Sequence, residues 1–279
     1  MEYDLDPKLL ERVIALAIDA GEAILRIYDG GDFDVEKKQD DSPLTAADLA
    51  AHKVLEAGLE PMLSGVPLLS EESVVPDFAT RQSWQRYWII DPLDGTKEFI
   101  NRNGEFTVNI ALIDGGVPVL GVVHVPVTGI TYAGVRQQGA FKLDGRGEKT
   151  AIRSRSMEGR GQVDKPVEVV ASRRHGAGAV DTLLAGLSDS LGSVETCNMG
   201  SSLKLCLVAE GEADIYPRLA PTMEWDTAAA QAVVEAAGGL VLDTQFEVVR
   251  YNTKDDLLNP FFYVVGDPDF AWRDLIGRM

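Results

Sequence analysis

Cysteine is nearly absent from this sequence of 279 residues, which contains only Cys197 and Cys206. Two cysteines are too few for a disulfide-rich scaffold, and neither stands in a CxxC or Cys/His pattern typical of a zinc site. The sequence also has no GxSxG element and no P-loop lysine, the marks of two other catalytic classes. Reduced thiols in the cytoplasm are the simplest interpretation of the cysteine usage.

Targeting signals are missing as well. The first residues, Met1-Glu2-Tyr3-Asp4, are acidic and lack the basic and apolar regions of a signal peptide. No run reaches the apolar length of a membrane helix. We therefore expect no integral membrane segment and a cytoplasmic location, with a peripheral position at the inner membrane as the only membrane association to consider.

Positive charge is scarce relative to negative charge: 26 Lys and Arg stand against 44 Asp and Glu, a formal net charge of −18. Such a charge repels nucleic acid polymers and anionic membranes. It repels a free phosphate ester equally, so an anionic substrate would need bound metal or a local basic patch. Solubility alone is the other interpretation of the acidic surplus.

Hydrophobic residues make up 45% of the chain, which is long enough for one large or two smaller domains. Residues 144–165 are polar with few apolar anchors, so we expect an N-terminal α+β domain (1–150) and a C-terminal α/β domain (151–279). The patterns predict helices over 7–28, 45–59, 179–187, 202–210 and 226–237, and strands over 32–38, 66–69, 87–90, 106–113, 117–125, 130–135, 140–143, 167–171, 193–196, 213–216, 240–243 and 261–265.

The sequence is organised around the stretch from Asp91 to Thr96, DPLDGT, which follows a short apolar run predicted to be a strand. Pro92 should end regular pairing, and Asp94-Gly95 should force a turn. Two carboxylates three residues apart can hold hard cations, and the amides of Gly95 and Thr96 can receive a phosphate if they open a helix. The alternative is a strand-end turn whose aspartates cap local amides.

Three further acids stand at the ends of predicted elements. Asp48 completes a capping box with Thr45, Glu71 follows a strand, and Asp226 opens an Ala-rich helix. The structural alternative for Asp48 and Asp226 is helix capping. The structural alternative for Glu71 is a place in a solvated loop. Side chains at element ends of a layered fold converge on one edge, however. Four acids could there neutralise two Mg²⁺ ions, which would bind a phosphate ester, lower the pKa of a bound water and stabilise the leaving oxygen: Glu71, Asp91, Asp94 and Asp226.

These motifs are similar to those of a known family. Residues 88–96, WIIDPLDGT, resemble the first signature of the inositol monophosphatase superfamily. Residues 225–229 together with 235–239 resemble its second, and 45–48 and 70–72 match two further family segments in order and spacing. The resemblance covers nearly the whole chain. It implies the five-layer α/β/α/β/α sandwich shared by inositol monophosphatases and fructose-1,6-bisphosphatases.

Within the superfamily, residues 95–100, 103–107 and 200–204 look like 3′(2′),5′-bisphosphate nucleotidases of the CysQ type. The resemblance implies that Asp48 and Thr96 position and activate the attacking water. The amides of Gly95 and Thr96 would seat the scissile phosphate. The implied Mg²⁺ ligands are Glu71, Asp91, the Leu93 carbonyl, Asp94 and Asp226.

The same resemblance implies the substrate contacts, which are Ser172, His175, Gly200, Lys204 and Asp226 beside the phosphate seat. Residues 172–175 could instead form a solvated turn, and Lys204 could be an ordinary surface lysine of its helix. Lys204 would pair with the second phosphate of a nucleotide and offset the acidic field. Glu72 and His124 are expected to be structural.

The implied reaction is hydrolysis of adenosine 3′,5′-bisphosphate (PAP) to AMP and phosphate, with 3′-phosphoadenosine 5′-phosphosulfate (PAPS) as a second substrate in sulfur assimilation. It would need two or three Mg²⁺ ions and be inhibited by Li⁺. The partner would be a small phosphate ester, and the protein a monomer or homodimer. The alternatives are an inositol monophosphatase or broad sugar-phosphate phosphatase, and a non-catalytic metal- or nucleotide-binding regulator.

Overall fold

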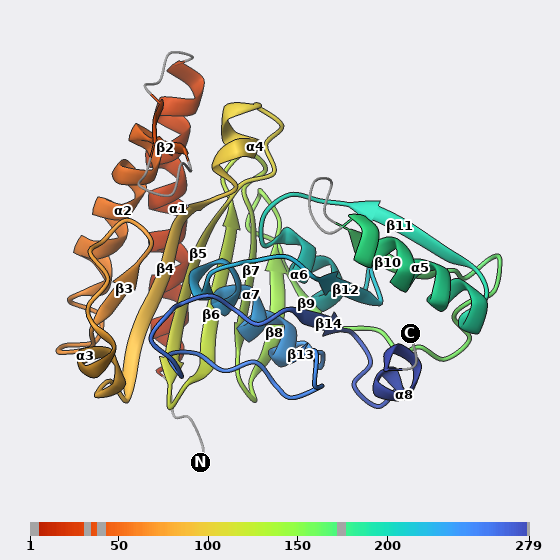
Figure 1. Cartoon of the computed structure of the whole chain (residues 1–279). Helices are drawn as coiled ribbons and strands as arrows, with labels where there is room; N and C mark the ends of the chain where they lie inside the picture. Colours follow the sequence, from red (N-terminus) through yellow and green to blue (C-terminus); the bar gives the residue numbers. More distant parts are fainter. Residues whose placement is uncertain (1–5, 31–34, 38–42, 172–176, 278–279) are drawn as a thin grey trace.

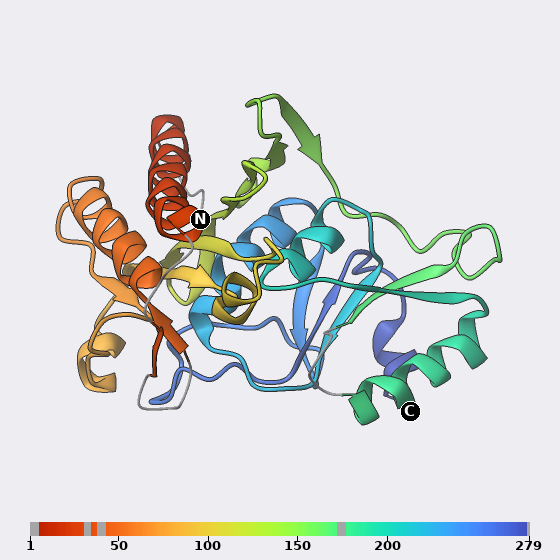
Figure 2. The same ribbon diagram turned by 90° about the horizontal axis from the view of Figure 1, so that it is seen from above.

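Two large β-sheets alternate with three helical layers in the computed structural model, which describes residues 6–30, 35–37, 43–171 and 177–277 (Figure 1). The outer layer on one side holds α1 (Pro7–Gly30) and α2 (Ala46–Leu59), and that on the other side holds α5 (Ala177–Leu191) and α8 (Trp272–Ile276). Between the sheets lie α6 (Leu203–Ala209) and α7 (Glu224–Ala236), as the view from above shows (Figure 2). The predicted five-layer sandwich is confirmed.

The first sheet has seven strands in the order β3-β4-β5-β6-β7-β8-β9. Only the β3–β4 pair is parallel, so the rest forms the predicted antiparallel meander. Gly115 and Gly116 both adopt positive φ, which makes the tight hairpin between two of its strands. The strands are β3 (Leu68–Ser70), β4 (Arg86–Asp94), β5 (Thr107–Asp114), β6 (Val117–Val125), β7 (Ile130–Val135), β8 (Gly139–Leu143) and β9 (Lys149–Ile152).

Strand β4 continues past the point where Pro92 was expected to end it. Its pairing with β5 shifts register between Asp91 and Asp94, which marks an irregularity of the bulge type. Proline is tolerated at a bulge because its missing N–H leaves no ladder bond unmade there. Regular pairing therefore ends at Asp91 as expected, whereas the strand itself continues to Asp94, and the shift lies between the two aspartates of the central motif.

Two short strands were also missed. β9 lies inside residues 144–165, where we predicted no element, and three of its four side chains are exposed, so it carries no apolar pattern. Pro43, predicted to lie in a loop, begins β2 (Pro43–Thr45), which pairs with β1 (Val35–Lys37). The two-domain division stays a prediction, and a boundary drawn between the sheets would fall after β9 rather than at residue 150.

The second sheet has five strands in the order β11-β10-β12-β14-β13. Helix α7 packs against both sheets, and on the first it lies unusually close. A Cβ built on Gly121 would lie 2.1 Å from the Ala229 carbonyl oxygen, and one on Gly134 would lie 2.9 Å from Val233 Cα. Only glycine allows this approach. The strands are β10 (Val167–Ala171), β11 (Val194–Asn198), β12 (Ile215–Arg218), β13 (Leu240–Asp243) and β14 (Phe262–Val265).

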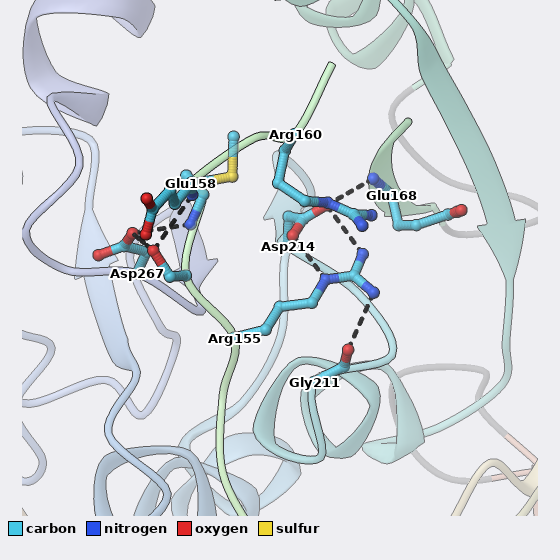
Figure 3. Close-up of polar contacts among 9 residues, drawn as sticks. Arg155, Glu158, Arg160, Glu168, Gly211, Asp214 and Asp267 are labelled. Atoms are coloured by element: carbon cyan, nitrogen blue, oxygen red, sulfur yellow. Dashed lines mark hydrogen bonds and ion pairs between the residues drawn. The ribbon is translucent and has the colours of Figure 1, made fainter. Parts of the chain in front are cut away.

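The segment between the two sheets is fixed by Asp214, whose side chain is fully buried (Figure 3). Arg155 donates to both oxygens of this carboxylate, at 2.7 and 2.8 Å, and to the Gly211 carbonyl at 2.9 Å. Arg160 and the backbone N–H of Glu168 donate to the same carboxylate. The linker is thereby attached to the end of α6 and the start of β12.

Along the described chain, no helix combines the length and the apolar character needed to cross a membrane.

Candidate active site

Three of the predicted acidic ligands come together at one edge of the first sheet. Ligand oxygens of Glu71, Asp91 and Asp226 all lie within 4.8 Å of one another. The parallel pairing of β3 with β4 carries Glu71 to this place, because its N–H donates to the Ile90 carbonyl at 3.3 Å. Asp91 stands at the shift in β4, and α7 supplies Asp226 from the middle layer.

Asp226 is not the N-cap of its helix, as its capping alternative supposed. The helix starts earlier, and Met223 is the cap residue. Asp226 lies in the first turn, where its Oδ2 accepts the Met223 N–H at 2.9 Å. One carboxylate oxygen is thus used for capping, while the side chain still reaches the acidic group.

The acidic group is electrostatically strained without a cation. Burial, followed by repulsion from Glu71 and Asp94, raises the pKa of Asp91 well above its ordinary value. Burial, followed by repulsion from Asp94 and Glu71, does the same to the pKa of Asp226. Clustered carboxylates repel one another when all are ionised, and a hard divalent cation such as Mg²⁺ offsets this repulsion by binding their oxygens. These residues therefore fit the metal that the motifs imply.

Asp94 stands beside this group rather than within it. Its Oδ2 accepts the Ser202 N–H at 2.5 Å and the Asn109 side-chain amide at 3.5 Å. Burial raises the pKa of Asp94 to about 6, and nearby Lys204 and the Ser202 amide oppose the rise. The Leu93 N–H donates to Asp91 Oδ1 at 3.0 Å, which fixes the turn, while its carbonyl as a ligand stays a prediction.

Lys204 is not a surface residue, so the alternative of an ordinary solvated lysine is wrong. It is only 8% exposed, and its Nζ donates to the Ser201 carbonyl at 2.6 Å and the Met199 carbonyl at 3.4 Å. Burial lowers the pKa of its ammonium group to about 8, and the Asp94 charge opposes that effect. A cation therefore lies close to Asp94 and lines one cavity with it.

That cavity has a volume of about 150 Å³, and it is lined both by predicted site residues and by residues that we did not predict to belong to the site. Gly95, with φ of 95°, Asp94, Gly200, Lys204 and Asp226 line it as expected. A Cβ on Gly200 would meet Glu105 O at 2.8 Å, so this glycine serves close approach of protein as well as lining the cavity. The lining residues that the sequence reasoning missed are Lys97, Glu98, Met199, Ser201, Ser202, Leu205, Tyr216, Arg218, Thr222, Thr227 and Phe262.

Arg218 is the missed residue with the plainest signal. It ends strand β12, and what we inferred for acids at the ends of predicted elements applies equally to this cation. It lines the same cavity as Lys204, and it lowers the pKa of Asp226 in opposition to burial. The cavity is thus lined by three cationic side chains, Lys97, Lys204 and Arg218, together with its acids, which provides the local basic patch that the net charge demanded.

Other predicted residues have mixed outcomes. Asp48 is buried in the first turn of α2, and Thr96 begins the short helix α4 (Thr96–Ile100), while their joint role in water activation stays a prediction. Ser172 and His175 lie outside the described residues.

His124 is buried, its Nδ1 lies 2.8 Å from Thr131 Oγ1, and burial lowers its pKa to about 4, as suits a structural residue. The structural role of Glu72 stays a prediction.

Known proteins match both the sequence and the fold. The inositol monophosphatase family model matches residues 6–267. A 3′(2′),5′-bisphosphate nucleotidase CysQ from Salmonella typhimurium is 48% identical over 92% of this chain and 99% of its own. The protein of that name from Haemophilus influenzae is 36% identical over 97% of each chain.

A solved structure gives the same result in three dimensions. The crystal structure of CysQ from Bacteroides thetaiotaomicron superposes with a TM-score of 0.80 at 43% identity, covering 93% of this chain and 97% of that one. Its description is of a bacterial member of the inositol monophosphatase family. With the family match over most of the chain, the buried acidic group and the five layers, these comparisons show that the chain belongs to the inositol monophosphatase family.

Proposed function

We propose that this protein is a divalent-cation-dependent phosphatase that hydrolyses adenosine 3′,5′-bisphosphate to AMP and phosphate. The observation that carries the proposal is that buried Lys204 lines the same cavity as Asp94 and Asp226. A substrate with two phosphates can place one at the acidic group, through bound cations, and the other at the cationic side chains that line the same cavity. The names of the relatives support this substrate. PAPS would be a second substrate, which would place the enzyme in sulfur assimilation.

The acidic group would hold the cations. Glu71, Asp91 and Asp226 form the compact donor set, and Asp94 and the Leu93 carbonyl complete the proposed ligands. Mg²⁺ is the proposed ion, two or three per chain, and Li⁺ is expected to inhibit. When bound, such ions lower the pKa of a water molecule and stabilise the negative charge that develops on phosphate oxygens.

The chain's own residues would orient the reactants. Asp48, buried at the start of α2, would accept the proton of the attacking water, with Thr96 as its hydroxyl partner. The oxygen–phosphorus bond to water forms while the bond to the ribose 3′-oxygen breaks, and that oxygen takes up a proton. The amides of Gly95 and Thr96 would hold the transferred phosphate, and Lys204 with Arg218 the other one. Ser172 and His175 are proposed nucleotide contacts.

A panel of phosphate esters with and without EDTA tests this function. Release of phosphate should require Mg²⁺ and should be faster from adenosine 3′,5′-bisphosphate than from inositol 1-phosphate. Asp94→Asn should lower kcat by about 10²–10³ while circular dichroism stays unchanged. Asp181→Asn, the same change at an exposed position of α5, is the matched control and should keep full activity.

Three outcomes would contradict the proposal. Full activity in EDTA would refute the cation requirement, and faster turnover of inositol 1-phosphate would favour a broad inositol or sugar phosphatase. No release from any ester with Mg²⁺ would favour a non-catalytic binding protein.

Cytoplasmic location and a monomeric or homodimeric state are also proposed. Light scattering during gel filtration tests the oligomeric state.

A further inference from the structure

A closed ring of hydrogen bonds ties Asp94 to two residues to which the proposed reaction gives no role. Asn109 lies in β5, and Ser202 stands directly before α6. The Ser202 N–H lies 2.5 Å and the Asn109 amide nitrogen 3.5 Å from the same oxygen, Asp94 Oδ2. The ring closes because the Ser202 hydroxyl lies 2.9 Å from Asn109 Oδ1. Asn109 and Ser202 are 1% and 2% exposed, so water does not compete for these bonds.

The chemistry of the groups fixes the direction of every bond in the ring. An ionised carboxylate can only accept, so Asn109 must turn its NH₂ group toward Asp94 and its carbonyl toward Ser202. The Ser202 hydroxyl must then donate to that carbonyl. Its remaining neighbour, the Thr107 hydroxyl at 2.9 Å, must donate to the Ser202 oxygen. The amide of Asn109 therefore has one permitted orientation.

We propose that Asn109 is a positioning residue that holds the Asp94 carboxylate in one rotamer, with Oδ2 occupied by donors and Oδ1 left for a divalent cation. The inference rests on the proposed function because it takes Asp94 as a cation ligand. Polar groups behind a metal ligand commonly fix its orientation in this way. The ring also joins β5 of the first sheet to the start of α6, the helix that carries Lys204.

A comparison of two near-isosteric variants tests the role. Asn109→Leu removes the donor to Asp94 and keeps the side-chain volume. Thr107→Val keeps the strand partner of Asp94 and removes a hydroxyl of the same network that bonds Ser202. Mn²⁺ is the probe, and its free concentration is read by electron paramagnetic resonance in the absence of substrate. Asn109→Leu should weaken Mn²⁺ binding roughly tenfold to 100-fold, the usual range for losing such a partner. Thr107→Val should bind Mn²⁺ like the unchanged protein.

Thermal unfolding without metal separates this role from a structural one. Both variants should lower Tm, because each leaves buried polar groups unpaired, but only one should change the Mn²⁺ affinity. If Asn109→Leu does not fold, Ser202→Ala breaks the ring from its other side and should also weaken Mn²⁺ binding. Equal Mn²⁺ affinity in the folded ring variants and the unchanged protein would overturn the positioning role alone. Absence of Mn²⁺ binding by the unchanged protein would overturn the cation centre and this inference together.

Discussion

Replacing Lys204 with methionine should turn a bisphosphate-selective enzyme into a less selective one. An ammonium group has three N–H donors, and two of those of Lys204 are directed at the carbonyls of Ser201 and Met199. One donor therefore remains for a ligand in the cavity that this side chain lines. Methionine keeps the apolar stem and a high helix propensity, so α6 should still form.

The size of the effect follows from that one remaining donor. A hydrogen bond to a charged group contributes roughly 1.5–3 kcal/mol. At about 1.4 kcal/mol per factor of ten, its loss corresponds to about a tenfold to 150-fold fall in kcat/KM. The fall should affect adenosine 3′,5′-bisphosphate and spare inositol 1-phosphate, which has no second phosphate to bind.

The assay is the ratio of the two kcat/KM values in the unchanged protein and the variant. Lys53→Met is the matched control, because Lys53 is an exposed lysine of α2 that does not line the cavity. The ratio should fall in Lys204→Met and stay constant in the control. A constant ratio in both would mean that Lys204 does not contact the substrate, and the nucleotide assignment would lose its main physical support.

A pH series gives the same prediction a second test. Burial lowers the pKa of Lys204 to about 8, so the free enzyme loses this positive charge as the pH rises past 8. The profile of kcat/KM reports groups of the free enzyme. Activity on the bisphosphate should therefore decline above pH 8 in the unchanged protein, relative to inositol 1-phosphate. This relative decline should be absent from Lys204→Met. Its persistence there would assign it to another group.

Three other results are expected. Thr96→Ala and Asp48→Asn should each lower kcat far more than they raise KM, and the double variant should have a kcat little lower than either single variant. If the two losses in kcat multiply in the double variant, the two residues act separately. Gly121→Ala should destabilise the protein by about 1–3 kcal/mol in urea unfolding, because its Cβ would meet a backbone oxygen of α7 at 2.1 Å; Gly178→Ala, with open space around it, should not. Burial lowers the pKa of His124 to about 4 from 6.5, so between these two pH values the unfolded chain binds more protons than the folded one. The free energy of unfolding should therefore fall by about 3 kcal/mol as the pH is lowered from 6.5 to 4. His124→Asn should lack this loss, and equal acid sensitivity of both proteins would refute the assignment.

The elements predicted best were those specified by local pattern. Strands β6 and β7 have the predicted bounds, because β-prone runs and glycine turns mark both ends of each. The motif acids were also found from sequence, since carboxylates at element ends stand out. Strand β9 was missed because its side chains are mostly exposed, and the continuation of β4 was missed because Pro92 gives a stop signal that a shift in register overrides.

The supporting residues of the site carried no comparable signal. Asn109 is one polar residue in an apolar strand, and Ser202 belongs to a recognised motif without an evident task. Their roles depend on a hydrogen-bonded ring between segments far apart in the chain. The burial of Lys204 likewise comes from packing between two sheets and not from its helix. Positions set by tertiary packing cannot be obtained from local periodicity.

The sequence order of the acidic group has a consequence for biosynthesis. Glu71 and Asp91 leave the ribosome early, whereas Asp226 is made only after most of the chain, and the group needs all three. A nascent chain carrying the first sheet alone would present two of these carboxylates without the third. Cation capture at the proposed centre would therefore be a late event that follows the arrival of α7 between the sheets. A bound ion then favours the completed fold over every unfinished form, because a ligand stabilises only the state that can hold it.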